Sequence, residues 1–131
     1  MILADTSAWI EYLRKTGSPV NRRLVEAIDE DEQLAVTEVV VMELLAGATD
    51  DARRYALRRL LYRFELVPVG GIATYEDAAE LYRRCRRGGE TPRRMIDCLI
   101  AAVAMRAGAE LLHSAEDFEV LARHSGLVTV P

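Results

Sequence analysis

The chain opens on four apolar residues, Met1–Ala4, and this run stops abruptly at an acid, Asp5. An uninterrupted apolar run of this kind is typical of a strand buried on both faces of a parallel sheet. Thr6 and Ser7 follow, and both are good N-cap residues for a helix over residues 8–13. Open α/β sheets bind ligands outside the carboxyl ends of their strands, so Asp5 is either a ligand-binding carboxylate or simply a helix cap.

The rest of the chain repeats this alternation of short apolar segments with helical patterns. Strands are predicted over residues 1–4, 34–36, 66–69, 109–113 and 127–130, and helices over residues 8–13, 19–31, 38–46, 50–64, 74–87, 93–107 and 116–124. The helix over residues 38–46 contains three consecutive valines, which favour a strand instead. The alternation predicts an α/β fold with a central parallel sheet of four to five strands.

Length and composition predict one ordinary globular domain over residues 1–131. A chain of 131 residues can bury roughly two thirds of its unfolded surface, and 50% of these residues are hydrophobic. No apolar run approaches the roughly 18 residues of a membrane span, and no secretory signal pattern is present, so we expect a cytoplasmic protein. Cys85 and Cys98 are too far apart in sequence for a close-spaced metal pair, and both are expected to be reduced.

The distribution of charged residues along the chain is more informative than the net charge. A net charge of −4 argues against a general nucleic-acid binder, because binding to the phosphate backbone needs clustered basic residues. Six arginines nevertheless lie between Arg83 and Arg94, with Glu90 as the only acid among them. A GC-rich genome would explain why Lys15 is the only lysine, but not why arginines gather here. The residues of this cluster that we expect to contact a nucleic-acid backbone are Arg86, Arg87, Arg93 and Arg94.

Four acids lie within or directly after apolar elements. Asp5 ends the first strand, Glu43 and Asp97 interrupt apolar helices, and Asp117 follows the fourth strand. Each alone could be a cap, a surface residue or half of an ion pair. Together they suggest a shared site, since the ends of the first and fourth strands of a parallel sheet can be neighbours. Acids of this kind are almost never fully buried unless they are paired, protonated or bound to metal.

Converging carboxylates repel one another unless a cation compensates them. Ligands that are all oxygen point to Mg²⁺ or Mn²⁺ rather than to Zn²⁺. Such an ion binds phosphate oxygens and lowers the pKa of a bound water, which is the chemistry of phosphodiester hydrolysis. The arginine cluster ends three residues before Asp97 and could guide a nucleic acid to the ion.

Four blocks of the chain together resemble the PIN domain, in particular the VapC-type ribonuclease toxins of bacterial toxin–antitoxin pairs. In chain order the blocks are DTSAWIEYL, VVMELLAG, RRMIDCLIAAVAMRAGAELLH and EDF. The resemblance implies a three-layer α/β/α fold, cleavage of RNA that depends on Mg²⁺ or Mn²⁺, and inhibition by a VapB-type antitoxin. It also implies a homodimer and a hetero-oligomer with the antitoxin.

The resemblance also assigns residues. Asp5 and Asp97 match the principal metal-binding aspartates, Glu43 the glutamate of the site and Asp117 its last acid, while Thr6 or Ser7 matches a supporting hydroxyl. One position departs from the pattern, because Ala115 stands where many relatives carry an acid. Glu116 or Asp117 could compensate.

The antitoxin is expected to insert an arginine into the acidic pocket and to cover apolar surface near Trp9, Tyr12 and Leu13. The alternative for Trp9 is a place in the core.

Three other interpretations compete with that of a PIN-domain ribonuclease. A haloacid-dehalogenase-type phosphatase needs a second aspartate two residues after the first, where this chain has Ser7. A receiver domain needs a late lysine, and Lys15 lies in the first helix. The serious alternative is an inactive PIN-like module that binds RNA or antitoxin without cleavage, which the alanine at position 115 makes conceivable.

Overall fold

A parallel sheet of four short strands forms the centre of the molecule. The computed structural model describes residues 1–131, and its strands are β1 (Ile2–Ala4), β2 (Leu34–Thr37), β3 (Glu65–Val67) and β4 (Glu110–Leu112). Their order is β3-β2-β1-β4, and every neighbouring pair is parallel. The predicted α/β class is confirmed, and β1 and β4 are indeed neighbours. The segment predicted as a fifth strand forms only one bridge, between Leu111 and Thr129.

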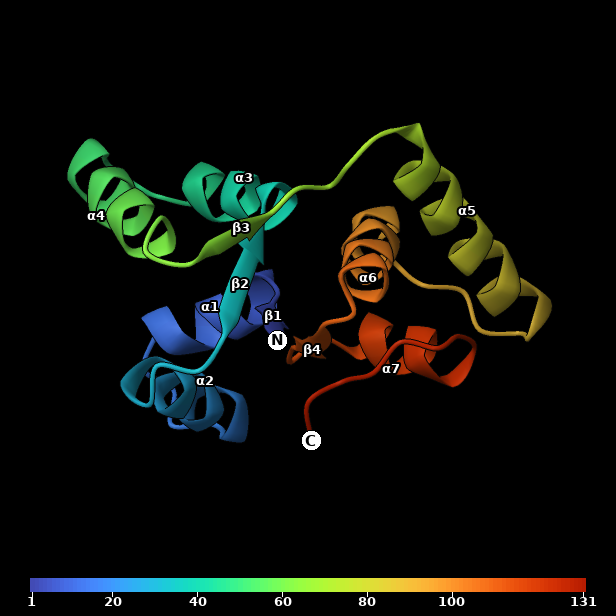
Figure 1. Cartoon of the computed structure of the whole chain (residues 1–131), viewed down its shortest axis with the longest axis horizontal. Coiled ribbons are helices and arrows are strands. Elements are labelled where there is room, and N and C mark those ends of the chain that lie inside the picture. Colours follow the sequence, from blue (N-terminus) through green and yellow to red (C-terminus); the bar gives the residue numbers. More distant parts are fainter.

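Seven helices connect and flank these strands. They are α1 (Thr6–Leu13), α2 (Pro19–Asp29), α3 (Glu38–Ala46), α4 (Asp51–Leu61), α5 (Ile72–Arg87), α6 (Met95–Ala107) and α7 (Glu116–Arg123). Figure 1 shows β1 and β4 between a group formed by α1 and α2 and a group formed by α5, α6 and α7. Helix α4 lies at the upper left and packs mainly on α3, which itself contacts β2, α1 and α6.

Three helix starts differ from the prediction by two residues, and one of them is α5, which begins at Ile72 rather than Thr74. Helix α1 begins at Thr6 rather than Ala8, because the Asp5 side chain itself accepts the amide of Ala8 and caps the helix. Helix α6 begins at Met95, two residues later than predicted. Asp5 is therefore the N-cap of α1. It also lies at the carboxyl end of β1, where parallel sheets bind their ligands.

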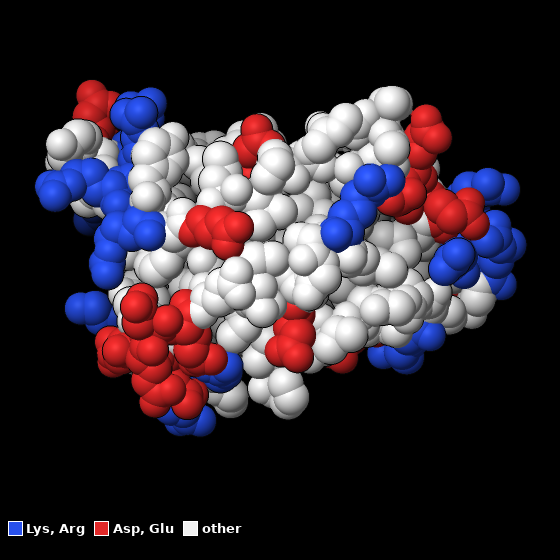
Figure 2. All heavy atoms as spheres, viewed as in Figure 1, with Lys and Arg blue, Asp and Glu red and all other residues white.

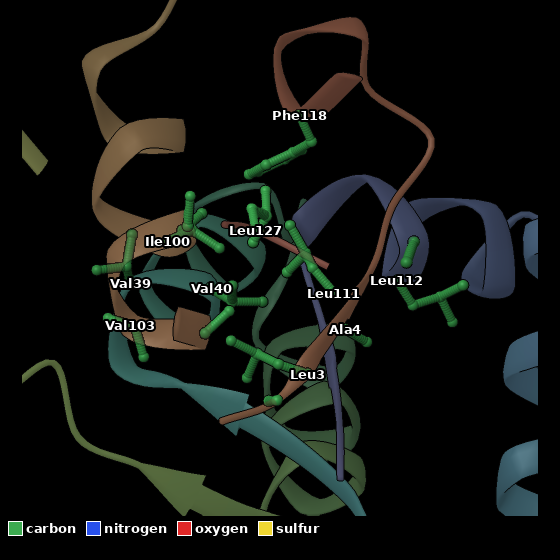
Figure 3. Close-up of a cluster of buried hydrophobic side chains, with 14 of the residues drawn as sticks. Leu3, Ala4, Val39, Val40, Ile100, Val103, Leu111, Leu112, Phe118 and Leu127 are labelled. Atoms are coloured by element: carbon green, nitrogen blue, oxygen red, sulfur yellow. The ribbon is translucent and has the colours of Figure 1, made fainter. Parts of the chain in front are cut away.

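One part of the core lies between the sheet and helices α3, α6 and α7, and residues of α1, α2 and α5 belong to the same buried cluster. Figure 3 shows side chains from all of these elements in contact, among them Leu3, Val40, Ile100, Leu111 and Phe118. The valines that made α3 ambiguous are explained by this core, since Val39 and Val40 are buried there. Burial has overridden the strand preference of these residues.

Trp9 belongs to the core and not to the surface. Its side chain is fully buried, and its ring lies 5.6 Å from the rings of both Tyr12 and Phe64. The expectation that Trp9 offers apolar surface to a partner is therefore wrong, whereas Leu13 of the same helix is exposed.

Two further predictions concern the cysteines and the membrane. Cys85 and Cys98 are both buried and unpaired, as expected for reduced core thiols. No helix combines the length and the apolarity that a membrane crossing requires.

Candidate active site

Asp5 lies at the carboxyl end of β1, where it is almost completely buried with 2% of its surface exposed. One of its oxygens, Oδ1, accepts the Ala8 amide at 2.9 Å and the Ser7 hydroxyl at 2.7 Å. Burial raises the pKa of Asp5 above its usual range, although these hydrogen bonds oppose the shift. Both of these hydrogen bonds go to Oδ1, so the capping role does not occupy the other oxygen, Oδ2.

Ser7 joins the ends of β1 and β4. Its hydroxyl donates to Asp5 and accepts the backbone amide of Ser114 at 2.8 Å. Ser114 follows β4, so this bond fixes the carboxylate of Asp5 relative to the neighbouring strand. The sequence analysis missed Ser114, because no local pattern reveals a partner 107 residues away.

Glu43 lies on α3 and reaches the same region from the neighbouring strand–helix unit. Its Oε1 accepts the Thr6 hydroxyl at 2.6 Å, and its Oε2 forms an ion pair with the guanidinium of Arg94. Thr6 therefore supports Glu43 and Ser7 supports Asp5, so the two consecutive hydroxyls hold different acids.

Asp97 and Asp117 form a coupled pair of buried acids. Asp97 has 4% of its surface exposed, and its pKa rises to about 7 through burial and through the hydrogen bond with Asp117, while the charges of Asp117 and Asp5 add to the shift. Asp117 has the opposite shift. Burial alone would raise its pKa, but the amide of Arg93, the bond with Asp97 and the amide of Arg94 together lower it.

Asp117 also has a structural role, because each of its oxygens accepts one backbone amide at 2.9 Å, from Arg93 and from Arg94. These amides directly precede α6, whose N-cap residue Arg94 provides no capping side chain of its own. Asp117 therefore caps α6 from α7 and positions the turn that carries Asp97.

Arg94 supplies a positive charge from within the chain. Its guanidinium pairs with Glu43, and its charge also lowers the pKa of Asp97. The acid cluster therefore consists of Asp5, Asp97 and Asp117 on one side and the Glu43–Arg94 pair on the other. The structure brings all four predicted acids into this one region.

The residues match a hard divalent cation in their chemistry but do not already form its binding site. Carboxylate and hydroxyl oxygens are the donors that Mg²⁺ and Mn²⁺ prefer. No three His, Cys, Asp or Glu side chains, however, converge closely enough to hold an ion. To hold such an ion together, these side chains would have to move closer to one another, and Arg94 is the cation that pairs with Glu43 in this structure.

The alanine at position 115 leaves the N-cap position of α7 without an acid, although Glu116 and Asp117 follow in the first turn of the helix. Ala115 is the N-cap residue of this helix and makes no capping bond through its side chain. Glu116 points to solvent and pairs weakly with Arg93 at 3.7 Å, so it does not join the cluster. Of the two residues that could compensate, only Asp117 lies with the other acids.

Most arginines of the predicted cluster have an acidic partner. Arg87 pairs with Glu80 at 3.0 Å, Arg93 with Glu116, and Arg94 with Glu43. Arg86 has no acidic partner and lies over the ring of Tyr82. Because Arg83 and Arg84 share the single carboxylate of Glu80 with Arg87, these ion pairs neutralise only part of the positive charge of the segment.

The raised pKa of Asp97 predicts how stability depends on pH in the absence of metal. The unfolded chain loses this proton near pH 3.8 and the folded protein only near pH 7, so the free energy of unfolding falls as the pH rises through this window. The slope is at most about 1.4 kcal/mol per pH unit. Thermal melting in EDTA across the window should show the fall, and Asp97→Asn should flatten it. A melting temperature that rises through this range in the parent protein would contradict the shift.

Comparison with known proteins shows similarity to a family of ribonucleases over most of the chain. The PIN domain family model matches residues 2–124. The chain is 45% identical over 130 residues to Ribonuclease VapC11 of Mycobacterium tuberculosis, covering 97% of this chain and 96% of that protein. It is 35% identical to Ribonuclease VapC32 of the same organism, over 85% of this chain and 82% of the relative.

Solved structures show the same fold at lower sequence identity. VapBC2 from Rickettsia felis, bound to a promoter DNA fragment, matches with a TM-score of 0.76 at 19% identity, over 99% of this chain and 98% of that one. Mycobacterium tuberculosis VapC20, a toxin that cleaves the sarcin–ricin loop, matches with a TM-score of 0.70 at 21% identity, over 99% and 98% of the two chains.

Proposed function

The chain belongs to the PIN-domain family, among the VapC ribonucleases, and from this membership we propose that it is a metal-dependent endoribonuclease and the toxin of a toxin–antitoxin pair. The proposed catalytic and metal-binding residues are Asp5, Glu43, Asp97 and Asp117. Residues 1–131 are proposed to form one PIN domain that acts in the cytoplasm, and the toxin is proposed to be a homodimer. The proposed metal is Mg²⁺, with Mn²⁺ as a possible substitute.

One observation carries this proposal. Asp5 and Asp97 are both buried, both have a raised pKa, and the charge of Asp5 itself raises the pKa of Asp97. Two such carboxylates at the carboxyl end of a parallel sheet are costly to keep unless they bind a cation or a proton. Asp5 also caps α1, but Asp97 accepts no backbone amide, so a structural role alone would be filled more cheaply by an apolar residue there.

The chain's own residues divide the work of the site. Asp5 and Asp97 would hold the ion, and the hydroxyls of Ser7 and Thr6 hold Asp5 and Glu43 in place. Asp117 fixes the first turn of α6 beneath Asp97. When bound, the metal would polarise the phosphodiester of the substrate and lower the pKa of a bound water.

Cleavage of RNA in defined metal conditions tests this function. The purified protein is expected to cut RNA internally with Mg²⁺ or Mn²⁺, to stop when EDTA is added and to recover when the metal is restored. Cleavage that persists in EDTA would overturn the metal-dependent mechanism. Binding of RNA without any cleavage in either metal would favour the inactive PIN-like module instead.

A groove beside the acid cluster supports a VapB-type antitoxin as the partner. The groove has a volume of about 790 Å³ and lies between α1, α3 and α4. Ile10, Leu13, Leu57 and Leu60 line it, and so does Glu43 of the candidate site. An amphipathic antitoxin segment could bury its apolar side chains here and bring a basic side chain to the acids.

Leu13→Asp is expected to weaken antitoxin binding by about tenfold or more, because it places a charge in the apolar groove. The melting temperature of the free toxin should hardly change, since Leu13 is exposed. Ile72→Asp is the matched control, because Ile72 is an exposed apolar residue at the start of α5, outside the groove. Affinity by calorimetry and melting by fluorescence separate the two effects. Equal affinity of the Leu13 variant and the parent would exclude the groove as the antitoxin site.

A further inference from the structure

The outer face of α4 carries a surface that the proposed function has not used. Arg58, Arg59 and Arg63 lie there with Tyr55 and Tyr62, and these five residues line a shallow depression of about 270 Å³. We call them the α4 patch. Both tyrosines are unusually exposed for aromatic residues, at 61% for Tyr55 and 60% for Tyr62.

The arginines of the α4 patch have no acidic partners. Neither Arg58, Arg59 nor Arg63 forms a salt bridge, and on α4 only Arg53 does so, with Asp50. Elsewhere in the chain most arginines are paired with acids, as Arg23 is with Glu32. The pairs are Arg23 with Glu26 and Glu32, Arg83, Arg84 and Arg87 with Glu80, Arg93 with Glu116, Arg94 with Glu43, Arg106 with Asp77 and Arg123 with Glu90. In a protein of net charge −4, α4 is thus a place where arginines without acidic partners gather, and Figure 2 shows basic side chains at this upper-left end.

The aromatic rings and the guanidinium groups are arranged together. Arg58 lies over the ring of Tyr62 at 5.1 Å and Arg59 over the ring of Tyr55 at 5.8 Å. Stacked in this way, each pair offers a cation and a flat apolar face side by side. Surfaces that bind single-stranded nucleic acid combine these two features, because arginines neutralise phosphates while unpaired bases stack on aromatic rings.

Helix α4 also lies between the α4 patch and the groove beside the candidate site. The opposite face of α4, with Arg53, Leu57 and Leu60, lines the groove that ends at Glu43. A strand held along the outer face of α4 can therefore continue over the rim of the groove toward the acids.

We propose that the α4 patch binds a single-stranded segment of the RNA substrate, with its arginines on phosphates and Tyr55 and Tyr62 stacked against bases. This inference rests on the proposed function and names the part of the surface that holds the substrate. A protein occupant, either the antitoxin or a second copy of the chain, is the competing outcome that the test must separate.

The test measures binding of a fluorescent single-stranded RNA by anisotropy in EDTA, where the RNA stays intact, at several salt concentrations. Arg58→Gln with Arg59→Gln is expected to lower the slope of log affinity against log salt by about 1.4, since each lost phosphate contact on a single strand contributes about 0.7. Tyr62→Ala is expected to weaken binding about five- to 150-fold, and Tyr62→Phe should retain it because stacking needs only the ring. Arg83→Gln with Arg84→Gln is the matched control. Like the Arg58/Arg59 variant, it removes two positive charges from adjacent positions. Arg83 and Arg84, however, both contact the carboxylate of Glu80.

The outcomes distinguish this inference from the proposed function. If the parent protein cuts RNA with Mg²⁺ while the Arg58/Arg59 variant keeps both the affinity and the salt slope, the α4 patch does not bind substrate and the nuclease proposal stands. If the parent neither binds nor cuts RNA, both proposals fail. If the variant loses antitoxin binding or self-association but binds RNA normally, the patch is a protein interface and the inference is overturned. Thermal melting confirms that each variant is folded.

Discussion

Asp97→Asn is expected to reduce metal-dependent RNA cleavage by about 1,000-fold or more, because it removes a carboxylate that would hold the ion, and metal stabilisation of the transition state is worth several kcal/mol. The protein should remain folded. In the metal-free state the substitution removes a repelling buried charge, so the melting temperature at neutral pH should rise rather than fall. Cleavage rates at saturating Mg²⁺ and melting curves in EDTA measure the two effects separately.

Asp51→Asn is the matched control for this prediction. Asp51 is an exposed aspartate in the first turn of α4, where it forms no salt bridge, so the same chemical change should leave both the rate and the melting temperature close to those of the parent. Asp5→Asn should also abolish cleavage, but it retains an oxygen that can cap α1. If Asp97→Asn cuts RNA at the rate of the parent protein, the acid cluster is not the catalytic site, whatever the family of the chain.

The positions of the acids in the fold were predictable because they depend on local patterns. The apolar run that ends at Asp5 gave β1 and its carboxyl end, and the parallel neighbours β1 and β4 bring Ser7 and Ser114 together. What the sequence could not reveal was which groups each acid contacts. Arg94 pairs with Glu43 across 51 positions of the chain, and only the packing of α6 against α3 determines such a contact.

Helix α1 shows why exposure was harder to predict than helix formation. Trp9 and Leu13 lie four residues apart, so the helical period placed them on one apolar side, yet Trp9 is fully buried and Leu13 is exposed. The helix has apolar residues toward the core at its start and toward the groove at its end. Periodicity identifies an apolar face but not where the core beneath it stops.

Some of the ion pairs could have been predicted from the spacing of charged residues in the sequence. Glu80 lies three, four and seven positions before Arg83, Arg84 and Arg87, which is the spacing at which side chains meet on a helix. Arg58 and Arg59 of α4 have no acid three or four positions before or after them. Counting arginines favoured the segment from Arg83 to Arg94, whereas counting unpaired arginines favours α4.

Asp117→Ala is expected to lower the free energy of unfolding by about 3 kcal/mol, because it removes two charge-assisted hydrogen bonds and leaves two backbone amides at the start of α6 without partners. Cleavage should fall as well, since these amides position the turn that carries Asp97. Urea unfolding and RNA cleavage below the melting transition give the two quantities. Glu116→Ala is the matched control. It lies in the same turn but points to solvent, so its effect on stability should stay within about 0.5 kcal/mol.

The comparison of stability and activity in Asp117→Ala decides what this acid does. Loss of stability with nearly full cleavage of the folded fraction would make Asp117 a cap for α6 and leave metal binding to Asp5, Glu43 and Asp97. Loss of cleavage without loss of stability would make it a ligand whose two amide contacts matter little. The structure favours loss of both, because the carboxylate that accepts the amides of Arg93 and Arg94 also bonds to Asp97. Asp117 then both caps α6 and contacts Asp97. A site with alanine at position 115 can therefore still hold its remaining aspartates in place.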